Sequence, residues 1–250
     1  MQKVKCVYWD VDGTLADTEM GGHRCAFNYA FKEAQLDWYW DIPTYADLLK
    51  IQGGINRIRS YGLSNGANLE ESNLIEIHSR KQFYYQQQIL KGKVFLRTGV
   101  LGLVEQLNSR GIAQWIVTTS SRNAVQSLID SSFNKDIAPF NGAITYEDVE
   151  KHKPYPDAYI KAISKSCIAP QNSIVIEDSL AGLLASTTAG ISCILTLPPW
   201  NKLISNQMKH ASAVLNHLGD SRNPCTVFQG PSCRSGKVTI DYLESIINRE

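Results

Sequence analysis

Short apolar runs alternate with segments of helical periodicity over the second half of this chain. Between the apolar runs, apolar side chains recur every three or four residues, as on one face of a helix. Such alternation is typical of α/β proteins, whose helices connect parallel strands and cover both faces of the sheet. We therefore predict a doubly wound, mostly parallel Rossmann-like sheet. Its expected strands include residues 112–118, 173–176 and 193–197, with a short one at Ile144.

An earlier apolar run, Val4–Trp9, is separated from this pattern by a block with few strand signals. Residues 17–92 instead show helical spacing, and residues 70–90 form one long amphipathic stretch. The chain thus begins a core strand, leaves the core and returns to it. We predict an α/β core made of residues 1–16 and 93–250, with an inserted α-helical cap domain at 17–92.

The first apolar run leads into Asp10-Val11-Asp12-Gly13-Thr14-Leu15. Residues two apart in an extended chain face the same side, so the two carboxylates can point into one small volume. One carboxylate can attack phosphorus, and the other can protonate the leaving oxygen and then activate water. We predict these roles for Asp10 and Asp12, respectively. A plain Asp-Gly turn with Asp10 as a helix cap is the simpler alternative; a calcium loop would need further acidic ligands that do not follow.

Four hydroxyl residues come straight after the apolar stretch Ile112–Val117. They are Thr118, Thr119, Ser120 and Ser121. Hydroxyls and backbone N–H groups at a strand-to-helix turn can hold a phosphate. Simple capping of the next helix by Ser120 or Ser121 is the alternative.

Lys153 precedes Pro154-Tyr155-Pro156, a stiff segment that suits the start of a helix. A lysine held there can balance the charge of a nucleophilic carboxylate and of phosphoryl oxygens. A solvated lysine in a lysine-rich loop is the alternative.

The strand predicted at 173–176 ends in two adjacent acids, Glu177 and Asp178. Together with Asp10, one of them can complete an oxygen-ligand site for Mg²⁺, which would offset the repulsion between phosphate and carboxylates. The two acids point to opposite sides of an extended chain, which favours Asp178 as the direct ligand. An acidic helix cap is the alternative.

Asp10–Leu15, Thr119, Lys153 and Glu177-Asp178 resemble, in order and type, the four motifs of the haloacid-dehalogenase-like phosphohydrolases. The resemblance extends to about Leu197, and the block at 17–92 is similar to the helical cap of the subgroup that holds β-phosphoglucomutase and CbbY. The residues most similar to those of CbbY are Asp17-Thr18-Glu19, Trp38-Tyr39-Trp40-Asp41, Gly53-Gly54, Arg57, His78 and Lys81.

This resemblance implies Mg²⁺-dependent hydrolysis of a phosphate ester through an aspartyl-phosphate. Asp10 would be the nucleophile and Asp12 the general acid/base, while Thr119 and Lys153 would hold the transferring phosphate. Asp10, the Asp12 carbonyl and Asp178 would bind Mg²⁺. The similarity to CbbY implies that the substrate is xylulose 1,5-bisphosphate, an inhibitor of the carbon-fixing enzyme Rubisco.

The cap residues are expected to select the substrate. Gly53-Gly54 permits close approach of a ligand to the backbone, and Arg57 follows within one helical turn. His78 and Lys81, three residues apart, share a helix face and can join Arg57 around a second, non-reacting phosphate. Glu19 can accept hydrogen bonds from sugar hydroxyls. Ordinary surface charge is the alternative for each of them.

The composition argues against two classes of partner. With 25 basic and 24 acidic residues the net charge is +1, too small to attract nucleic acid or an anionic membrane surface. No apolar run is long enough to span a bilayer, and the N-terminus lacks an apolar signal core. We expect a monomer in the cytoplasm or the plastid stroma that binds a small phosphosugar.

The tail shows little periodicity. Residues 201–236 carry clusters of proline, glycine and serine, and Val238–Asn248 is predicted to be a closing helix. Cys225 and Cys233 lie eight residues apart in this tail, where a disulfide is possible but not favoured in a reducing compartment.

Two other functions are compatible with these motifs. A phosphomutase of the β-phosphoglucomutase kind would pass its aspartyl-phosphate to a second substrate. A non-catalytic binding protein on the same fold would be expected to lack a catalytic carboxylate, whereas Asp10, Asp12 and Asp178 are all present.

Overall fold

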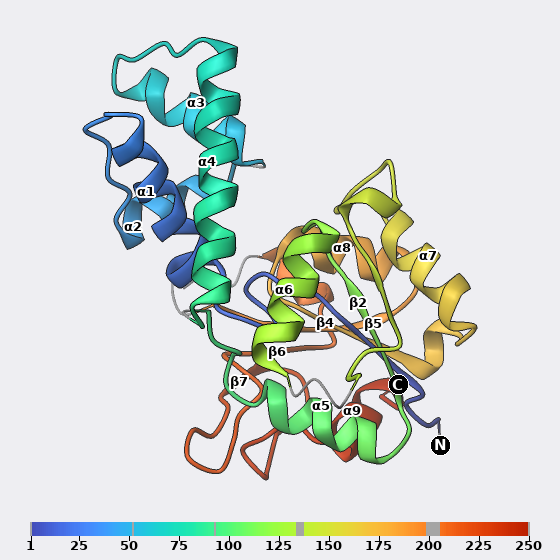
Figure 1. Cartoon of the computed structure of the whole chain (residues 1–250). Helices are drawn as coiled ribbons and strands as arrows, with labels where there is room; N and C mark the ends of the chain where they lie inside the picture. The colour runs from blue at the N-terminus through green and yellow to red at the C-terminus, as the bar shows by residue number, and fades with distance from the viewer. Residues whose placement is uncertain (1, 52, 93, 134–137, 199–205, 250) are drawn as a thin grey trace. The chain divides into compact units, whose positions relative to one another are not determined.

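The computed structural model describes residues 2–51, 53–92, 94–133, 138–198 and 206–249 (Figure 1). The chain divides into two compact units. The core unit comprises Met1–Ala16 and Leu96–Glu250, and the inserted unit comprises Asp17–Phe95. The cap predicted from the sequence ends at residue 92, just before Lys93, which lies outside the described residues.

A single seven-stranded sheet forms the centre of the described core unit, with the strand order β3-β2-β1-β4-β5-β6-β7. All neighbouring pairs are parallel except β6 and β7, which are antiparallel. The prediction of a doubly wound, mostly parallel sheet is confirmed. The strands are β1 (Cys6–Trp9), β2 (Ala113–Val117), β3 (Gly142–Ile144), β4 (Ser173–Glu177), β5 (Ser192–Thr196), β6 (Ala213–Leu215) and β7 (Val227–Gln229).

Helices cover both faces of this sheet. In Figure 1, α7 (Asp157–Ser166) and α8 (Leu180–Thr188) lie on one face, and α5 (Val100–Ser109) and α9 (Ile240–Ile247) lie on the other. Helix α6 (Arg122–Ser132) connects β2 to the segment before β3. Short helical turns complete the unit at η2 (Tyr146–Asp148), η3 (Pro170–Asn172) and η4 (Asn206–His210).

The central strand β1 is buried on both sides, which explains its continuous apolar sequence. Cys6 and Tyr8 face the helices α7 and α8. On the opposite face the Trp9 indole N–H donates to the Gln114 side-chain oxygen (3.0 Å), and the Gln114 amide donates to a carbonyl of α5. Gln114 is fully buried, so these bonds satisfy its polar atoms inside the core.

Strands β6 and β7 lie in the tail, where the sequence predicts little regular structure. Ala213–Leu215 is fully buried and pairs with β5, but three residues are too few to show a strand periodicity. Part of this tail, residues 199–205, lies outside the described residues.

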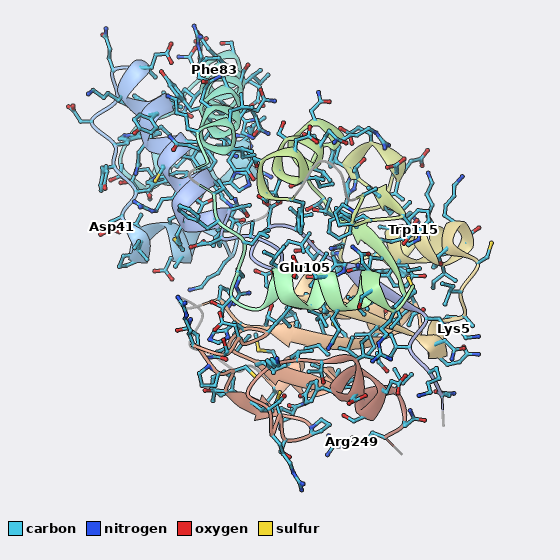
Figure 2. The ribbon with its side chains drawn as sticks, turned by 60° about the horizontal axis from the view of Figure 1, so that its bottom comes forward. Lys5, Asp41, Phe83, Glu105, Trp115 and Arg249 are labelled. Atoms are coloured by element: carbon cyan, nitrogen blue, oxygen red, sulfur yellow. The ribbon has the colours of Figure 1, made fainter. Side chains whose placement is uncertain are left out.

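The described part of the inserted unit is α-helical, as the sequence predicts. It contains the turn η1 (Glu19–His23) and helices α1 (Arg24–Glu33), α2 (Ile42–Leu48), α3 (Gly54–Ser64) and α4 (Glu71–Leu90). Helix α1 packs along α4, and Trp40 is fully buried against the Phe27 ring (centroids 4.6 Å apart). Asp41 and Phe83 of this unit, labelled in Figure 2, are both exposed.

None of the helices among the described residues has the length and apolar character that crossing a membrane requires. Helix α5 is amphipathic instead. Glu105, labelled in Figure 2, is exposed, whereas Leu103 and Val104 beside it are buried.

Candidate active site

The loop after β1 carries the two predicted catalytic carboxylates at the carboxyl end of the sheet. The Asp10 backbone N–H donates to the Ile176 carbonyl (3.0 Å), so this loop begins beside the end of β4. Gly13 adopts φ +82°, and a Cβ there would collide with the Asp178 carboxylate. A glycine at this position is therefore required both for the turn and for the close approach of Asp178.

A buried ion-pair network surrounds Lys153, as the sequence predicts for a charge-balancing lysine. Its Nζ lies 2.7 Å from Asp10 Oδ1 and 2.5 Å from Glu177 Oε1, and it also donates to the Val117 carbonyl (2.8 Å). The Lys153 and Glu177 side chains are 5% and 0% exposed. The alternative of a solvated lysine is therefore wrong. Glu177 and Asp10 lie 24 and 143 residues from Lys153 in the chain, and only the sheet brings the three side chains together.

The surroundings change the acidity of both partners. Burial and then the negative charge of Glu177 raise the pKa of Asp10, while the Lys153 ammonium opposes this rise. Burial alone would lower the pKa of Lys153, but the charges of Asp10 and Glu177 raise it above its ordinary value. Lys153 is consequently a permanent cation, and a further cation near Asp10 would favour its ionised form.

The hydroxyl segment after β2 divides into side chains with different contacts. The Ser120 hydroxyl donates to the Asp12 carboxylate, which fixes the orientation of that carboxyl group. Ser121 caps α6, since its Oγ accepts a backbone N–H of the first turn (3.4 Å). Thr118 is buried, and its Oγ1 accepts the Ser120 backbone N–H (3.1 Å), whereas Thr119 is exposed at the end of the strand. Capping and site formation thus both occur, on different residues.

Asp10, Glu177 and Asp178 place carboxylate oxygens within 4.8 Å of one another. These hard oxygen donors suit Mg²⁺, and the rise in the pKa of Asp10 that Glu177 causes indicates excess negative charge there. The donor set therefore fits a magnesium ion. Glu177 also accepts hydrogen bonds from Tyr159 (2.8 Å) and Lys153, so its carboxylate is already engaged. Asp178, half-buried beside Gly13, is the better candidate for direct ligation.

Arg97 is a residue of this region that the sequence analysis does not identify. Its guanidinium donates to the Gly13 carbonyl in the catalytic loop, to the carbonyls of Thr196 (2.8 Å) and Leu197 (2.9 Å), and to that of Asn216 (2.7 Å). Arg97 thus ties the loop that carries the carboxylates to β5 and β6. A lone arginine at the start of a helical segment gives no sequence signal for this arrangement, because its partners are distant in the chain.

The inserted unit gathers its own predicted residues into a second cluster. His78 lies against the Gly54 backbone, where a Cβ would stand 2.6 Å from its Nε2, and Lys81 Nζ lies 2.8 Å from His23 Nδ1. Lys81 follows His78 by one turn of α4, and Arg57 lies on α3, which packs against α4. Elsewhere in the unit, Gly53 adopts φ +84° at the start of α3, and Glu19 accepts a hydrogen bond from the Tyr45 hydroxyl (2.7 Å).

The His78 imidazole is expected to titrate far below neutrality. Burial, followed by the charges of Lys81, His23 and Arg57, lowers its pKa to about 4. The unfolded chain, with an ordinary value of 6.5, therefore binds more protons between these two values. Acidification from pH 6.5 towards 4 should cost about 1–2 kcal/mol of unfolding free energy, after allowance for the partial exposure of the ring.

Urea unfolding of the wild type and of His78→Gln over this pH range measures that effect. The difference between the two proteins should grow steadily towards pH 4. Parallel pH profiles would show that His78 is protonated equally well in the folded and unfolded chains.

The chain is similar to known proteins over a range that includes parts of both units. A family model described as haloacid dehalogenase-like hydrolase matches residues 7–196. CbbY of Rhodobacter capsulatus is 34% identical over 78% of this chain and 86% of its own length, and a plasmid CbbY of Cupriavidus necator is 32% identical over 88% of each. The crystal structure of a CbbY mutant from Rhodobacter sphaeroides in complex with xylulose-(1,5)bisphosphate has a TM-score of 0.74 and 29% identity, covering 86% of this chain and 94% of that one.

Proposed function

Since the chain belongs to the haloacid dehalogenase-like hydrolase family and is a phosphoric monoester hydrolase, we propose that it dephosphorylates a sugar bisphosphate with the aid of Mg²⁺. The observation that carries this proposal is the presence of two separate groups of phosphate-attracting side chains. Lys153 stands beside the carboxylates of the core unit, and Arg57, His78 and Lys81 gather in the inserted unit. A substrate with one phosphate would need only the first group.

The core residues supply the chemistry. An Asp10 oxygen attacks phosphorus, and the bond to the sugar oxygen breaks as Asp12 gives that oxygen a proton. Asp12 then accepts a proton from water as the water attacks the aspartyl-phosphate, which releases inorganic phosphate and restores Asp10. Lys153 and Thr119 hold the phosphoryl oxygens, and the hydrogen bond from Ser120 keeps the Asp12 carboxyl oriented. Asp10, the Asp12 carbonyl and Asp178 would hold Mg²⁺, which would neutralise charge at the phosphate.

The inserted unit supplies recognition of the non-reacting end. Arg57 presents a cationic group and His78 a ring nitrogen to a second phosphate, and Lys81, buried on α4 beside His23, adds positive charge to the cluster. The bound xylulose bisphosphate in the relative from Rhodobacter sphaeroides supports xylulose 1,5-bisphosphate as the substrate of this chain as well.

Phosphate release from a panel of sugar phosphates, with Mg²⁺ and with EDTA, tests this function. The panel contains xylulose 1,5-bisphosphate, ribulose 1,5-bisphosphate, fructose 1,6-bisphosphate and β-glucose 1-phosphate. We expect Mg²⁺-dependent hydrolysis with the highest kcat/KM for xylulose 1,5-bisphosphate. Isomerisation of β-glucose 1-phosphate with little phosphate release would identify a mutase instead, and inactivity towards every ester would indicate a binding protein.

Replacement of Arg57 by glutamine tests the second phosphate site. Loss of a charge-assisted contact should raise KM for a bisphosphate about 10- to 100-fold and change kcat little. KM for a monophosphate substrate should stay the same. Arg59→Gln is the matched control, because Arg59 lies two residues away and pairs with Glu71 (2.6 Å). Equal effects of the two substitutions would contradict a specific contact from Arg57.

A further inference from the structure

Two cysteines meet in the tail of the core unit, in the segment where the sequence shows little order. Cys225 and Cys233 are both free and half-buried, and the backbone of each is hydrogen-bonded to Gly236. They flank β7 on its two sides, so the strand and the turn after it bring the two residues together. This pair is distant from the carboxylates of the catalytic loop in sequence and has no part in the proposed hydrolysis.

Backbone hydrogen bonds hold the pair in place. The Cys225 N–H donates to the Gly236 carbonyl (2.7 Å), and the Gly236 N–H donates to the Cys233 carbonyl (3.0 Å). Gly236 adopts φ +66°, and a Cβ there would stand 2.7 Å from the Pro224 side chain. The proximity of the cysteines therefore arises from main-chain geometry rather than from a chance orientation of two side chains.

Helix α9 closes the other side of the pair. The Tyr242 hydroxyl donates to the Pro231 carbonyl (3.2 Å), within the loop between the two cysteines. Burial and then the charges of Cys233 and Cys225 raise the pKa of Tyr242 to about 12. The pair is thus a shaped, partly shielded site at the edge of the core.

The other cysteines do not offer a competing partner within the core. Cys6 and Cys193 are fully buried, and burial raises the pKa of each thiol. Cys25 belongs to the inserted unit, and Cys167 is exposed at the end of α7. Full burial keeps Cys6 and Cys193 away from a dissolved disulfide, whereas Cys225 and Cys233 are partly exposed, so these two are the pair in the described core that can react together.

We propose that Cys225 and Cys233 are a thiol–disulfide exchange site that closes an intramolecular disulfide when it meets an oxidised low-molecular-weight or protein disulfide. One of the two thiols gives its proton to solvent, attacks one sulfur of the external disulfide, forms a mixed disulfide and releases the first thiolate. The other thiol then gives its proton to solvent and attacks the protein sulfur of the mixed disulfide, releasing the second thiolate. Two protein thiols are oxidised, and the external disulfide is reduced to two thiols.

Burial and then the nearby Cys233 thiol raise the pKa of Cys225 to about 12, which agrees with the closeness of the two residues that the backbone hydrogen bonds show.

The segment that the disulfide would close is connected to the core framework. The Thr226 N–H donates to Asn216 Oδ1 (2.8 Å), and the Asn216 carbonyl accepts from Arg97 (2.7 Å). Closing the loop should stabilise this framework by restricting the unfolded chain. From the loop length we expect the unfolding midpoint of the oxidised protein to rise by about 5 °C.

Peptide mapping of the whole protein tests the proposal. The native chain is equilibrated with oxidised glutathione, alkylated and digested with trypsin. Cleavage after Arg222 and Arg234 leaves both cysteines in one peptide, 223–234. We expect this peptide to become two hydrogens lighter, to resist alkylation, and to regain both thiols after dithiothreitol. Full alkylation of both cysteines in the oxidised sample, or glutathione adducts without closure, would overturn the proposal.

Variants separate the two thiols. Cys225→Ser and Cys233→Ser should each form no intramolecular disulfide and accumulate a glutathione adduct on the cysteine that remains. Cys167→Ser, which removes an exposed cysteine, should not change closure. Wild-type chain treated in guanidinium supplies a measurement that needs no variant: closure should fall and mixed adducts should increase, because the fold no longer holds the sulfurs together. Equal closure in the native and unfolded chains would contradict a site built by the structure.

Discussion

Substitution of Asp10 by asparagine is expected to lower phosphate release by about 10⁴-fold or more while the protein remains folded. The amide keeps the shape of the side chain but cannot act as a nucleophile towards phosphorus. The Asp10 carboxylate contacts Lys153 (2.7 Å), and its backbone is fixed by β4, so no neighbouring acid can move into its place without disturbing the sheet.

Steady-state phosphate release at saturating Mg²⁺ measures this loss. Asp130→Asn serves as the control, because Asp130 is exposed on α6 and accepts a hydrogen bond from the neighbouring Gln126 amide (2.8 Å). Circular dichroism and the urea midpoint establish that each variant is folded. If Asp10→Asn kept more than a tenth of the wild-type rate, the nucleophile would have to be another group.

Substitution of Lys153 by methionine is expected to be the most destabilising of the changes considered. It leaves Asp10 and Glu177 as two buried carboxylates without their common cation, which should cost about 3–5 kcal/mol of unfolding free energy. The same change should abolish phosphate release, because the ionised form of Asp10 would lose its main stabilising charge. Urea unfolding at neutral pH measures the stability, and phosphate release measures the activity.

Two further variants sharpen this test. Lys151→Met alters an exposed lysine in the same loop and should change stability by less than about 0.5 kcal/mol. Adding Glu177→Gln to Lys153→Met should recover part of the lost stability, since it removes one of the uncompensated charges. A Lys153→Met protein that unfolds at the wild-type urea concentration would show that the network does not stabilise the fold.

The main contacts of Glu177 in the structure differ from the metal contact that the sequence predicts. The sequence places Glu177 and Asp178 together as metal-site candidates. In the structure the Glu177 carboxylate lies at the end of β4, fully buried, where it accepts from Lys153 and Tyr159. A carboxylate buried in this way needs such donors. The Glu177 carboxylate also leaves no room for a side chain at Gly182. Glu177 therefore positions Lys153, whatever further contact it makes with a metal ion.

The sequence by itself determined the class of fold and the chemical groups of the candidate site. Strand and helix periodicities are local, and each site residue is marked by the apolar strand that it follows, as Asp10 follows β1 and Asp178 follows β4. The tail strands β6 and β7 escaped prediction because strands of three residues are too short to carry a periodic signal.

Only the tertiary structure decided which groups meet. The links from Arg97 to Gly13, from Tyr159 to Glu177 and from Cys225 to Cys233 join residues whose spacing in the chain carries no information about contact. Sheet order and side-chain packing bring them together, and burial then sets their charges, as the pairing of Lys153 with two carboxylates shows. Short-range patterns specify the elements and their reactive ends, whereas long-range packing specifies the partners.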